Sequence, residues 1–132
     1  MKQITIVAED KVGLLADISY ILGKARINIE SIAVEVIGTK GIINLTLKDD
    51  KRATQMLESN GYKVLSSEVL VVKVKDEPGE LSGISKRLVD AGINVESLYL
   101  LSRHGGYSLD AIKVDNPKKA AKLLEGYLVK GQ

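Results

Sequence analysis

The chain has 132 residues, of which 45% are apolar and 27% charged, with a net charge of +2 at pH 7. This balance is typical of a soluble globular protein and argues against a disordered or a membrane protein. Cysteine is absent, which excludes disulfides, thiol nucleophiles and cysteine metal sites.

The charges are spread evenly along the chain. A nucleic-acid-binding surface would need a concentrated basic face, so we expect no nucleic-acid partner. No apolar run approaches the roughly 18 residues of a membrane span, and nothing resembles a signal peptide. We therefore expect a cytoplasmic protein with no membrane partner.

The first half of the chain alternates strand and helix patterns. Helices are indicated where apolar residues recur every three or four positions, and strands where β-branched residues cluster. The predicted order is a strand over 4–8, a helix over about 14–25, strands over about 27–37 and 41–48 joined by a tight turn, a helix that stops at Gly61, and a short strand over 62–65. Glycine is the usual residue just after a helix.

The second half predicts the same order of elements. These are a strand over 69–75, a helix from about Pro78 to 91, strands near 93–103 and 106–114, a helix over 117–125, and a stunted strand around 127–129. No Pro/Gly/Ser-rich linker separates the halves, so we expect two packed domains, residues 1–67 and 68–132. Domains of about 65 residues are marginal alone, and each should lean on another unit.

An internal repeat connects the halves. The segment from Asp10 to Ile32 aligns without a gap with the segment from Asp76 to Leu98, and about half of the aligned residues are identical. The identical pairs include Asp10/Asp76, Gly13/Gly79, Leu15/Leu81, Ile18/Ile84, Leu22/Leu88, Asn28/Asn94 and Glu30/Glu96. Both halves should therefore be α+β units of βαββαβ topology, which is the ferredoxin-like arrangement, with two helices on one face of an antiparallel sheet.

Proteins with this fold have many different functions, so the function must be inferred from particular residues. RNA recognition would need aromatic residues on the strands, yet Phe and Trp are absent. A metal chaperone would need cysteines, and an acyl-phosphate hydrolase an arginine-bearing loop after the first strand. The loops here read Asp10–Lys11–Val12–Gly13 and Asp76–Glu77–Pro78–Gly79.

Each loop leads into a helix, and an Ile-Asn-(Ile/Val)-Glu-Ser segment follows that helix. This pattern resembles the ACT domain, whose motif is Asp/Asn-x-Pro-Gly-x-Leu followed by a Gly-(Ile/Val)-Asn segment. The second copy matches throughout, whereas the first has Val12 in place of Pro and Arg26 in place of Gly. The Asn-(Ile/Val)-Glu-Ser sequence also resembles the ACT unit of acetolactate synthase small subunits.

The resemblance implies a tandem pair of ACT units that binds a small amino acid at the interface between two units and signals to a regulated enzyme or regulator. It also implies a homodimer, no enzymatic activity, no cofactor and no metal. Each binding site at this interface would combine the loop of one unit with the asparagine of the other. The predicted ligand-binding residues are Asp10, Lys11, Val12, Gly13, Leu14 and Asn28, with Asp76, Pro78, Gly79, Glu80, Leu81 and Asn94.

These residue types suit a zwitterion. Free N–H groups at a helix start attract a carboxylate, an Asp accepts hydrogen bonds from an ammonium group, and an Asn amide both donates and accepts. Because Glu80 stands where the first copy has Leu14, the first loop should be the better anion acceptor. A Glu80→Leu substitution should then strengthen carboxylate binding at the second loop. Small or branched aliphatic ligands are favoured.

Structural roles remain open for the same residues. Asp10 and Asp76 could cap the helices with Pro78 in the first helical position, Gly13 and Gly79 could only form tight turns, and the asparagines could bond their own backbone. The alternative function is a structural or regulatory-subunit interaction module without a ligand. His104 lies in a predicted turn with no nucleophile partner, so an enzyme ranks last.

Overall fold

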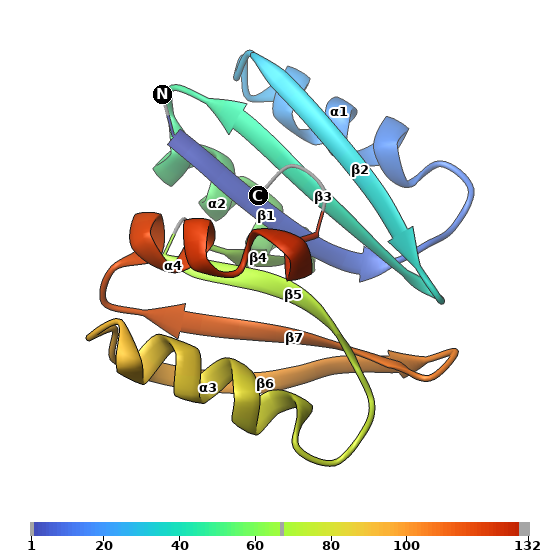
Figure 1. Ribbon diagram of the computed structural model, residues 1–132. Coiled ribbons are helices and arrows are strands. Elements are labelled where there is room, and N and C mark those ends of the chain that lie inside the picture. The colour runs from blue at the N-terminus through green and yellow to red at the C-terminus, as the bar shows by residue number, and fades with distance from the viewer. Residues whose placement is uncertain (1, 67, 130–132) are drawn as a thin grey trace. The chain divides into compact units, whose positions relative to one another are not determined.

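A computed structural model describes residues 2–66 and 68–129. The chain divides into two compact units, and the second begins at Glu68. Each unit is described by itself (Figure 1). None of the described helices is long and apolar enough to cross a membrane.

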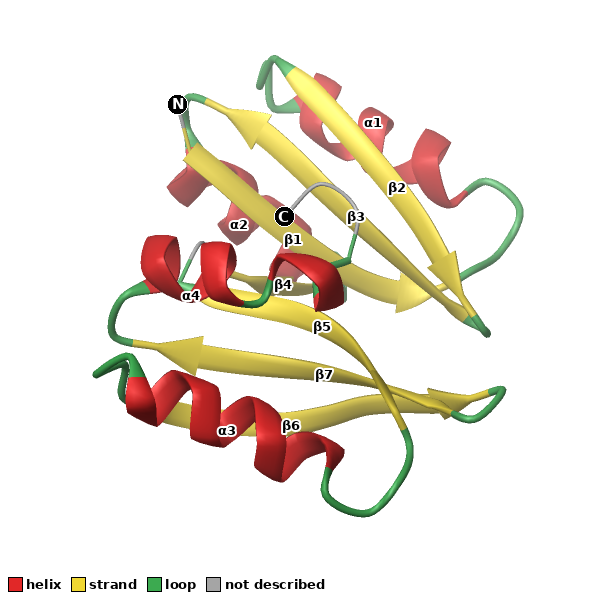
Figure 2. Cartoon of the chain, viewed as in Figure 1, coloured by secondary structure: helices red, strands yellow, loops and turns green. Residues whose placement is uncertain are grey.

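The first unit has the predicted βαββαβ order. Its elements are β1 (Lys2–Glu9), α1 (Leu14–Lys24), β2 (Ser31–Ile37), β3 (Lys40–Leu47), α2 (Asp50–Ser59) and β4 (Lys63–Leu65). The strands form an antiparallel sheet in the order β2-β3-β1-β4, and both helices cover one face of it (Figure 2). This confirms the fold expected from the repeat.

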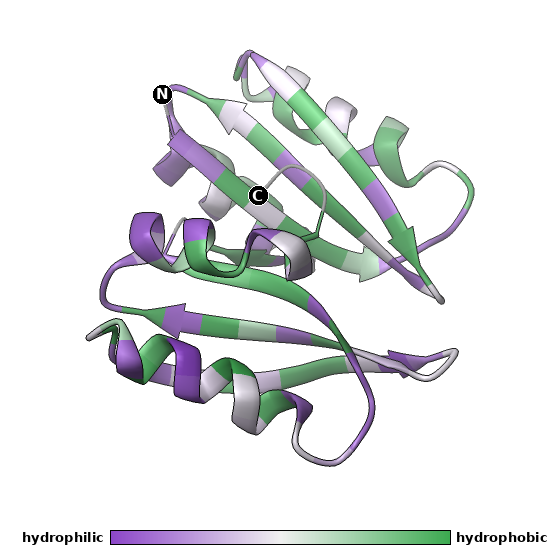
Figure 3. Cartoon of the chain, in the orientation of Figure 1, coloured by the Kyte–Doolittle hydropathy of each residue, from purple (hydrophilic) through white to green (hydrophobic). Residues whose placement is uncertain are grey.

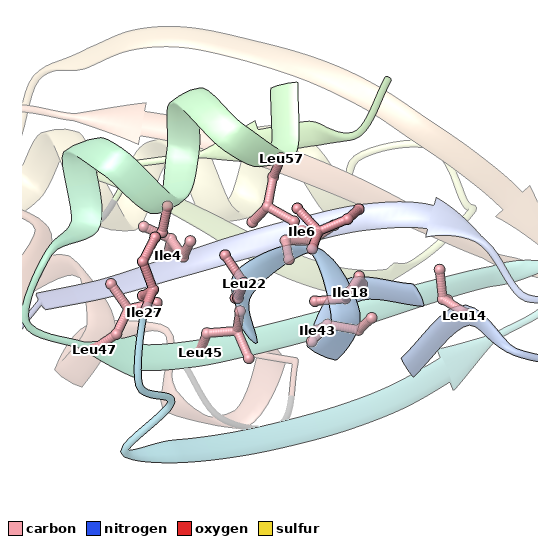
Figure 4. Packing of buried hydrophobic residues seen from close by; sticks show 12 residues of the cluster. Ile4, Ile6, Leu14, Ile18, Leu22, Ile27, Ile43, Leu45, Leu47 and Leu57 are labelled. Carbon is pink, nitrogen blue, oxygen red and sulfur yellow. The ribbon is translucent and has the colours of Figure 1, made fainter. Parts of the chain in front are cut away.

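The core of the first unit lies between this sheet and its two helices. Figure 4 shows residues of β1, β3, α1 and α2 pointing toward one another there. Ile6, Ile18, Leu22 and Ile43 are fully buried. Burial of one such side chain contributes about 1.5–3 kcal/mol, so this apolar stripe of α1 fixes the helix on the sheet.

The second unit repeats this plan except at its last strand. Its elements are β5 (Val69–Lys75), α3 (Glu80–Asp90), β6 (Val95–His104), β7 (Tyr107–Val114), α4 (Pro117–Leu123) and a 3-10 helix, η1 (Glu125–Tyr127). The sheet order is β5-β7-β6, and apolar residues of α3 and α4 pack on one face (Figure 3). The stunted last strand is reduced to a bridge between Leu128 and Val72.

Strands β2 and β6 begin later than the sequence predicts. Ile27 and Ile93 were expected to open them, but each donates its backbone N–H to a carbonyl of the preceding helix, Leu22 or Leu88, at 2.9 Å. These bonds close the helix C-termini, so the two isoleucines end a helix instead of starting a strand. The same motif ends α2, where Gly61 adopts a φ of +89° as predicted for a glycine just past a helix.

A β-bulge in β6 changes the number of sequence positions that separate equivalent residues of the two units. Val34 pairs with Ile43 in the first unit, and Leu100 pairs with Asp110 in the second. The register shifts between Leu100 and Ser102, so Leu101 is an additional residue. Up to Leu100, equivalent residues of the two units are separated by the constant offset of the sequence repeat. Beyond Leu101 the offset is one residue larger.

Candidate functional site

The first candidate loop joins β1 to α1. The backbone N–H of Asp10 donates to the carbonyl of Thr39 at 2.7 Å and ties the loop to the β2–β3 hairpin. Gly13 then adopts a φ of +87° and the helix begins at the next residue, with Asp17 N–H bonded to the Gly13 carbonyl at 2.8 Å. Glycine is the residue that takes this left-handed conformation without strain, so it sets the direction of the helix.

The second loop has the same backbone path. Asp76 N–H donates to the Gly106 carbonyl at 2.9 Å, and Gly79 has a φ of +89° directly before α3. The two glycines are therefore the N-caps of α1 and α3. Neither helix has a side-chain cap, so the expectation that Asp10 and Asp76 cap the helices is wrong.

The start of α3 also differs from the prediction. Pro78 was expected at the first helical position, but the helix begins at Glu80 and Pro78 lies in the turn before the cap. The physical reason is the left-handed glycine between them, which breaks the helical path. Pro78 and Gly79 are both exposed, and Leu81 packs against the core of the second unit.

A pocket of about 370 Å³ opens beside the first loop. It is lined by Asp10, Lys11, Gly13, Leu14, Leu15, Ala16 and Val34. Four predicted ligand residues therefore share one pocket, whereas Val12 between them is fully exposed and lines none of it. Leu15 and Ala16 belong to the first helical turn, where backbone N–H groups have no carbonyl partner within the helix. The pocket thus offers N–H donors, a carboxylate and an ammonium group beside apolar carbon.

The corresponding side chains in the second unit are arranged differently. Asp76 forms an ion pair with Arg103, with 3.0 Å between Oδ2 and Nε. Glu80 lines a pocket of about 300 Å³ together with Lys73, Lys75, Tyr107, Gly126 and Tyr127. The carboxylate of Glu80 lies among basic side chains, a position that the first unit fills with Leu14.

The two asparagines follow the first helix of each unit. Asn28 lines a pocket of about 260 Å³ with Arg26, Ile27, Glu30, Lys48, Asp49 and Arg52. Asn94 is held by backbone bonds to Asp115, whose Oδ1 accepts the Asn94 N–H at 3.0 Å. Asn28 does not line the pocket beside the loop of its own unit. The pairing of each asparagine with the other unit's loop stays a prediction.

Two ionisable groups near the first unit's helices have shifted pKa values. The Lys40 ammonium donates to Glu9 Oε1 at 2.6 Å and lowers the pKa of that carboxyl. Burial, and then the hydrogen bond from its hydroxyl to Asp17, raise the pKa of Tyr62 to about 12. Among the residues that the structure describes, no group of His, Cys, Asp or Glu side chains could hold a metal ion.

A family model described as an ACT domain pair matches residues 1–128. The chain belongs to the ACT domain family. The resemblance to a tandem pair of ACT domains stated from the sequence is confirmed. The ACT fold is that of regulatory domains. No curated protein sequence matches this ACT pair.

Several solved structures are similar to this ACT pair. Protein BT0572 from Bacteroides thetaiotaomicron is 24% identical, with 97% of this chain and 90% of that chain covered and a TM-score of 0.49. The ligand-free regulatory subunit of aspartate kinase from Thermus thermophilus is 17% identical, with 94% and 90% covered and a TM-score of 0.45. The ACT domain of prephenate dehydrogenase from Bacillus anthracis is 24% identical and covers 48% of this chain and 99% of its own, with a TM-score of 0.43.

Sequence reasoning missed part of the surroundings of the ACT loops. Leu15, Ala16 and Val34 also line the first pocket. Leu15 and Ala16 could have been predicted, because they directly follow Leu14 in the expected helix. Lys48 and Arg52 beside Asn28 carried no signal, since they lie at a strand end and on a second helix. Only the folded chain brings them to Asn28.

Proposed function

We propose that this ACT pair is a non-catalytic regulatory module that binds a small amino acid at the interface between two ACT units. Occupancy would change the association of the module with a partner protein, an enzyme or regulator. Such coupling requires only that the ligand bind two arrangements of the module with different affinity. The proposal includes assembly as a homodimer and needs no cofactor.

The pocket beside the first loop carries this proposal. Its donors suit an α-carboxylate, because the first turn of α1 presents free N–H groups and the positive end of the helix dipole. Asp10 in the same pocket can accept hydrogen bonds from an α-ammonium group. Both charged groups of an amino acid therefore find partners within one pocket.

The remaining lining favours a small aliphatic side chain. Leu14, Leu15, Ala16 and Val34 contribute apolar carbon, and none of the described residues that line the pocket is aromatic. A volume of about 370 Å³ is at the lower end for ligand pockets, which commonly measure about 300–1,000 Å³. A small or branched aliphatic amino acid fits these properties best.

A thermal-shift screen against the twenty amino acids tests the proposal. A ligand present at 100 times its dissociation constant should add about 2.7 kcal/mol of stability to the wild-type chain. The Asn28→Ala, Asn94→Ala double variant should lose this stabilisation. Gln55→Ala serves as the control, because it removes an exposed amide from α2 and should leave the shift unchanged.

The screen has a clear negative outcome. If no amino acid stabilises the wild type, the sensor function is rejected, and an interaction module without a ligand takes its place. If one amino acid stabilises wild type and double variant equally, binding is real but the asparagines do not form the site.

A further inference from the structure

A pocket of the second unit brings charged side chains of both signs together. It has a volume of about 300 Å³ and lies at the start of α3, where Glu80 lines it. Lys73 and Lys75 of β5 line the same pocket. Among the residues that the structure describes, no ion pair joins Glu80 to either lysine. Two ammonium groups and one carboxylate are therefore available to a ligand.

Tyrosine rings order the side chains around this pocket. Lys73 Nζ lies 4.6 Å from the centre of the Tyr107 ring, and this cation–π contact keeps the ammonium group beside the pocket. Tyr127 lines the pocket and also packs against the apolar core of the unit. Arg87 lies over the Tyr127 ring at 5.5 Å, so a third positive charge is close to a lining residue.

The equivalent positions of the first unit have a different charge pattern. Glu9 and Lys40 are paired in the sheet and form an ion pair with 2.6 Å between Oε1 and Nζ, so their charges cancel. The other two positions are apolar. The second unit thus has a net positive set with one carboxylate where the first unit has a neutral set. The corresponding residues are Val7 and Lys73, Glu9 and Lys75, Leu14 and Glu80, and Lys40 and Tyr107.

The charges of the pocket match those of an acidic amino acid, which carries two carboxylates and one ammonium group. A lysine donates hydrogen bonds to a carboxylate, and Glu80 can accept them from an ammonium group. Two lysines and one glutamate therefore supply a partner of opposite charge for each charged group of the ligand. A neutral amino acid would leave one lysine without a partner, and a basic one would meet both lysines with a like charge.

We infer that this pocket binds an acidic amino acid, with Lys73 and Lys75 holding its two carboxylates and Glu80 its ammonium group. This inference rests on the proposed amino-acid-binding function and adds a second ligand class, because the pocket beside the first loop favours an aliphatic ligand. The volume of about 300 Å³ is at the lower end for ligand pockets, which suits a ligand of this small size.

Glutamate and glutamine have nearly the same shape and differ in one charge, so their comparison tests the two lysines. Both are titrated at constant ionic strength into the full-length chain labelled with ¹⁵N, and the backbone amides of Glu80, Gly126 and Tyr127 report on the pocket. Glutamate should bind there with a dissociation constant about fivefold lower than that of glutamine, since exposed ion pairs contribute modestly. Equal dissociation constants, or no binding of glutamate, would overturn the inference.

The Lys73→Gln, Lys75→Gln double variant removes both positive charges from the pocket and should abolish the preference for glutamate. Lys86→Gln together with Lys118→Gln is the matched control, because this variant removes two lysines of the same unit that do not line the pocket. All four side chains are exposed, so both variants should fold. A preference for glutamate that survives in the first variant would contradict the inference.

Glutarate lacks the ammonium group of glutamate and tests Glu80. The wild type should bind glutamate more tightly than glutarate. In Glu80→Gln the affinity for glutarate should rise, in line with the gain in carboxylate binding expected for Glu80→Leu, and the glutamate-to-glutarate preference should fall. A preference that is unchanged in Glu80→Gln would overturn the inference.

Failure of the inference and failure of the proposed function give different results. Only the inference fails if glutamate and glutamine bind this pocket equally while an amino acid stabilises the chain through the asparagines. The proposed function fails if none of the twenty amino acids stabilises the wild type.

Discussion

Arg26 holds a backbone conformation that glycine holds at the equivalent place in the second unit. Its φ is +58°, and Gly92 has a φ of +74°. Both N–H groups bond back to the helix that has just ended, to Gly23 at 3.0 Å and to Val89 at 2.9 Å. The left-handed region costs a residue with a Cβ about 1–2 kcal/mol, so the first unit stores strain next to Asn28.

Arg26→Gly should therefore stabilise the chain. The gain should be about 0.5–1 kcal/mol, because the relief of strain is partly offset by the greater flexibility of glycine in the unfolded chain. Urea denaturation measures the difference. Gly92→Ala is the matched control and should destabilise the chain by about 1 kcal/mol. An unchanged or lower stability of Arg26→Gly would show that the arginine side chain compensates for its backbone.

Tyr62 links the chain after α2 to α1 through its hydroxyl and Asp17. Its pKa rises from 10.0 to about 12 on folding, so the protonated phenol favours the folded state. The stabilisation is complete below pH 10 and is lost as the pH rises through about 12. Tyr62→Phe should remove that part of the decline in unfolding free energy between pH 10 and 12.

The effect of Tyr62 should not exceed about 1 kcal/mol, since a partly exposed pair is screened by solvent. Chemical denaturation of wild type and Tyr62→Phe at several pH values measures it. Tyr20→Phe is the control, because Tyr20 is an exposed tyrosine of α1. Parallel curves for wild type and Tyr62→Phe would contradict the prediction.

At the scale of helices, the second helix of each unit has a side-chain cap that the first helix lacks. Asp49 and Asn116 accept the N–H groups of Arg52 and Lys119, each at 3.2 Å. Asp49→Ala and Asn116→Ala should each cost about 1 kcal/mol of stability, measured by thermal or urea denaturation. Lys51→Ala on the exposed side of α2 is the control, and its effect should stay within about 0.5 kcal/mol.

Basic side chains reinforce the same two helices. Arg52 Nη2 donates to the carbonyl of Ala25, and Lys119 Nζ donates to that of Ala91 at 2.6 Å. Each bond satisfies a carbonyl at the end of the unit's first helix, which would otherwise have no partner in the helix. Both units thus share this feature, which the sequence repeat does not reveal. The bulge at Leu101 makes the offset between Arg52 and Lys119 one residue larger than the offset of the repeat.

The order of the elements could be predicted from the sequence because apolar spacing reports which side of a helix or strand is buried. The start of α3 could not, since Asp76 and Pro78 both fit a helix start and only the φ of Gly79 decides between them. The burial of Asp110 was also missed. At the constant offset of the repeat it aligns with Asn44, a polar residue, whereas the sheet register gives it the place of the core residue Ile43.

Only part of the candidate site could be predicted from the sequence. Asp10, Lys11, Gly13 and Leu14 are adjacent in sequence, so a repeated motif could place them in one pocket. Val34 comes from a strand that only the sheet register brings to the helix start. A motif identifies residues that are neighbours along the chain and gives no information on partners from other elements.

At the scale of the whole molecule, each sheet ends in a long edge strand. β2 and β6 lie at the edges of their sheets and carry the exposed apolar side chains Ile32, Val36, Leu98 and Leu100. An exposed edge strand presents backbone N–H and C=O groups with which a further strand can pair. They support the proposed homodimer.

Sedimentation velocity should find the wild type as a dimer. Val36→Lys and Leu100→Lys introduce charge on the two edges and should together shift the protein toward monomer. Val89→Lys is the control, because Val89 is an exposed apolar residue on α3 and lies on no edge strand. A monomeric wild type at tens of micromolar would exclude the homodimer.

The bulge at Leu101 marks the place where the two repeated halves of this chain differ in length. An edge strand has one neighbour, so an inserted residue disturbs a single ladder of hydrogen bonds. β7, at the centre of its sheet, would have to slip against two partners. The additional residue at Leu101 thus lies on an edge strand, where the ladder of hydrogen bonds that it disturbs is a single one.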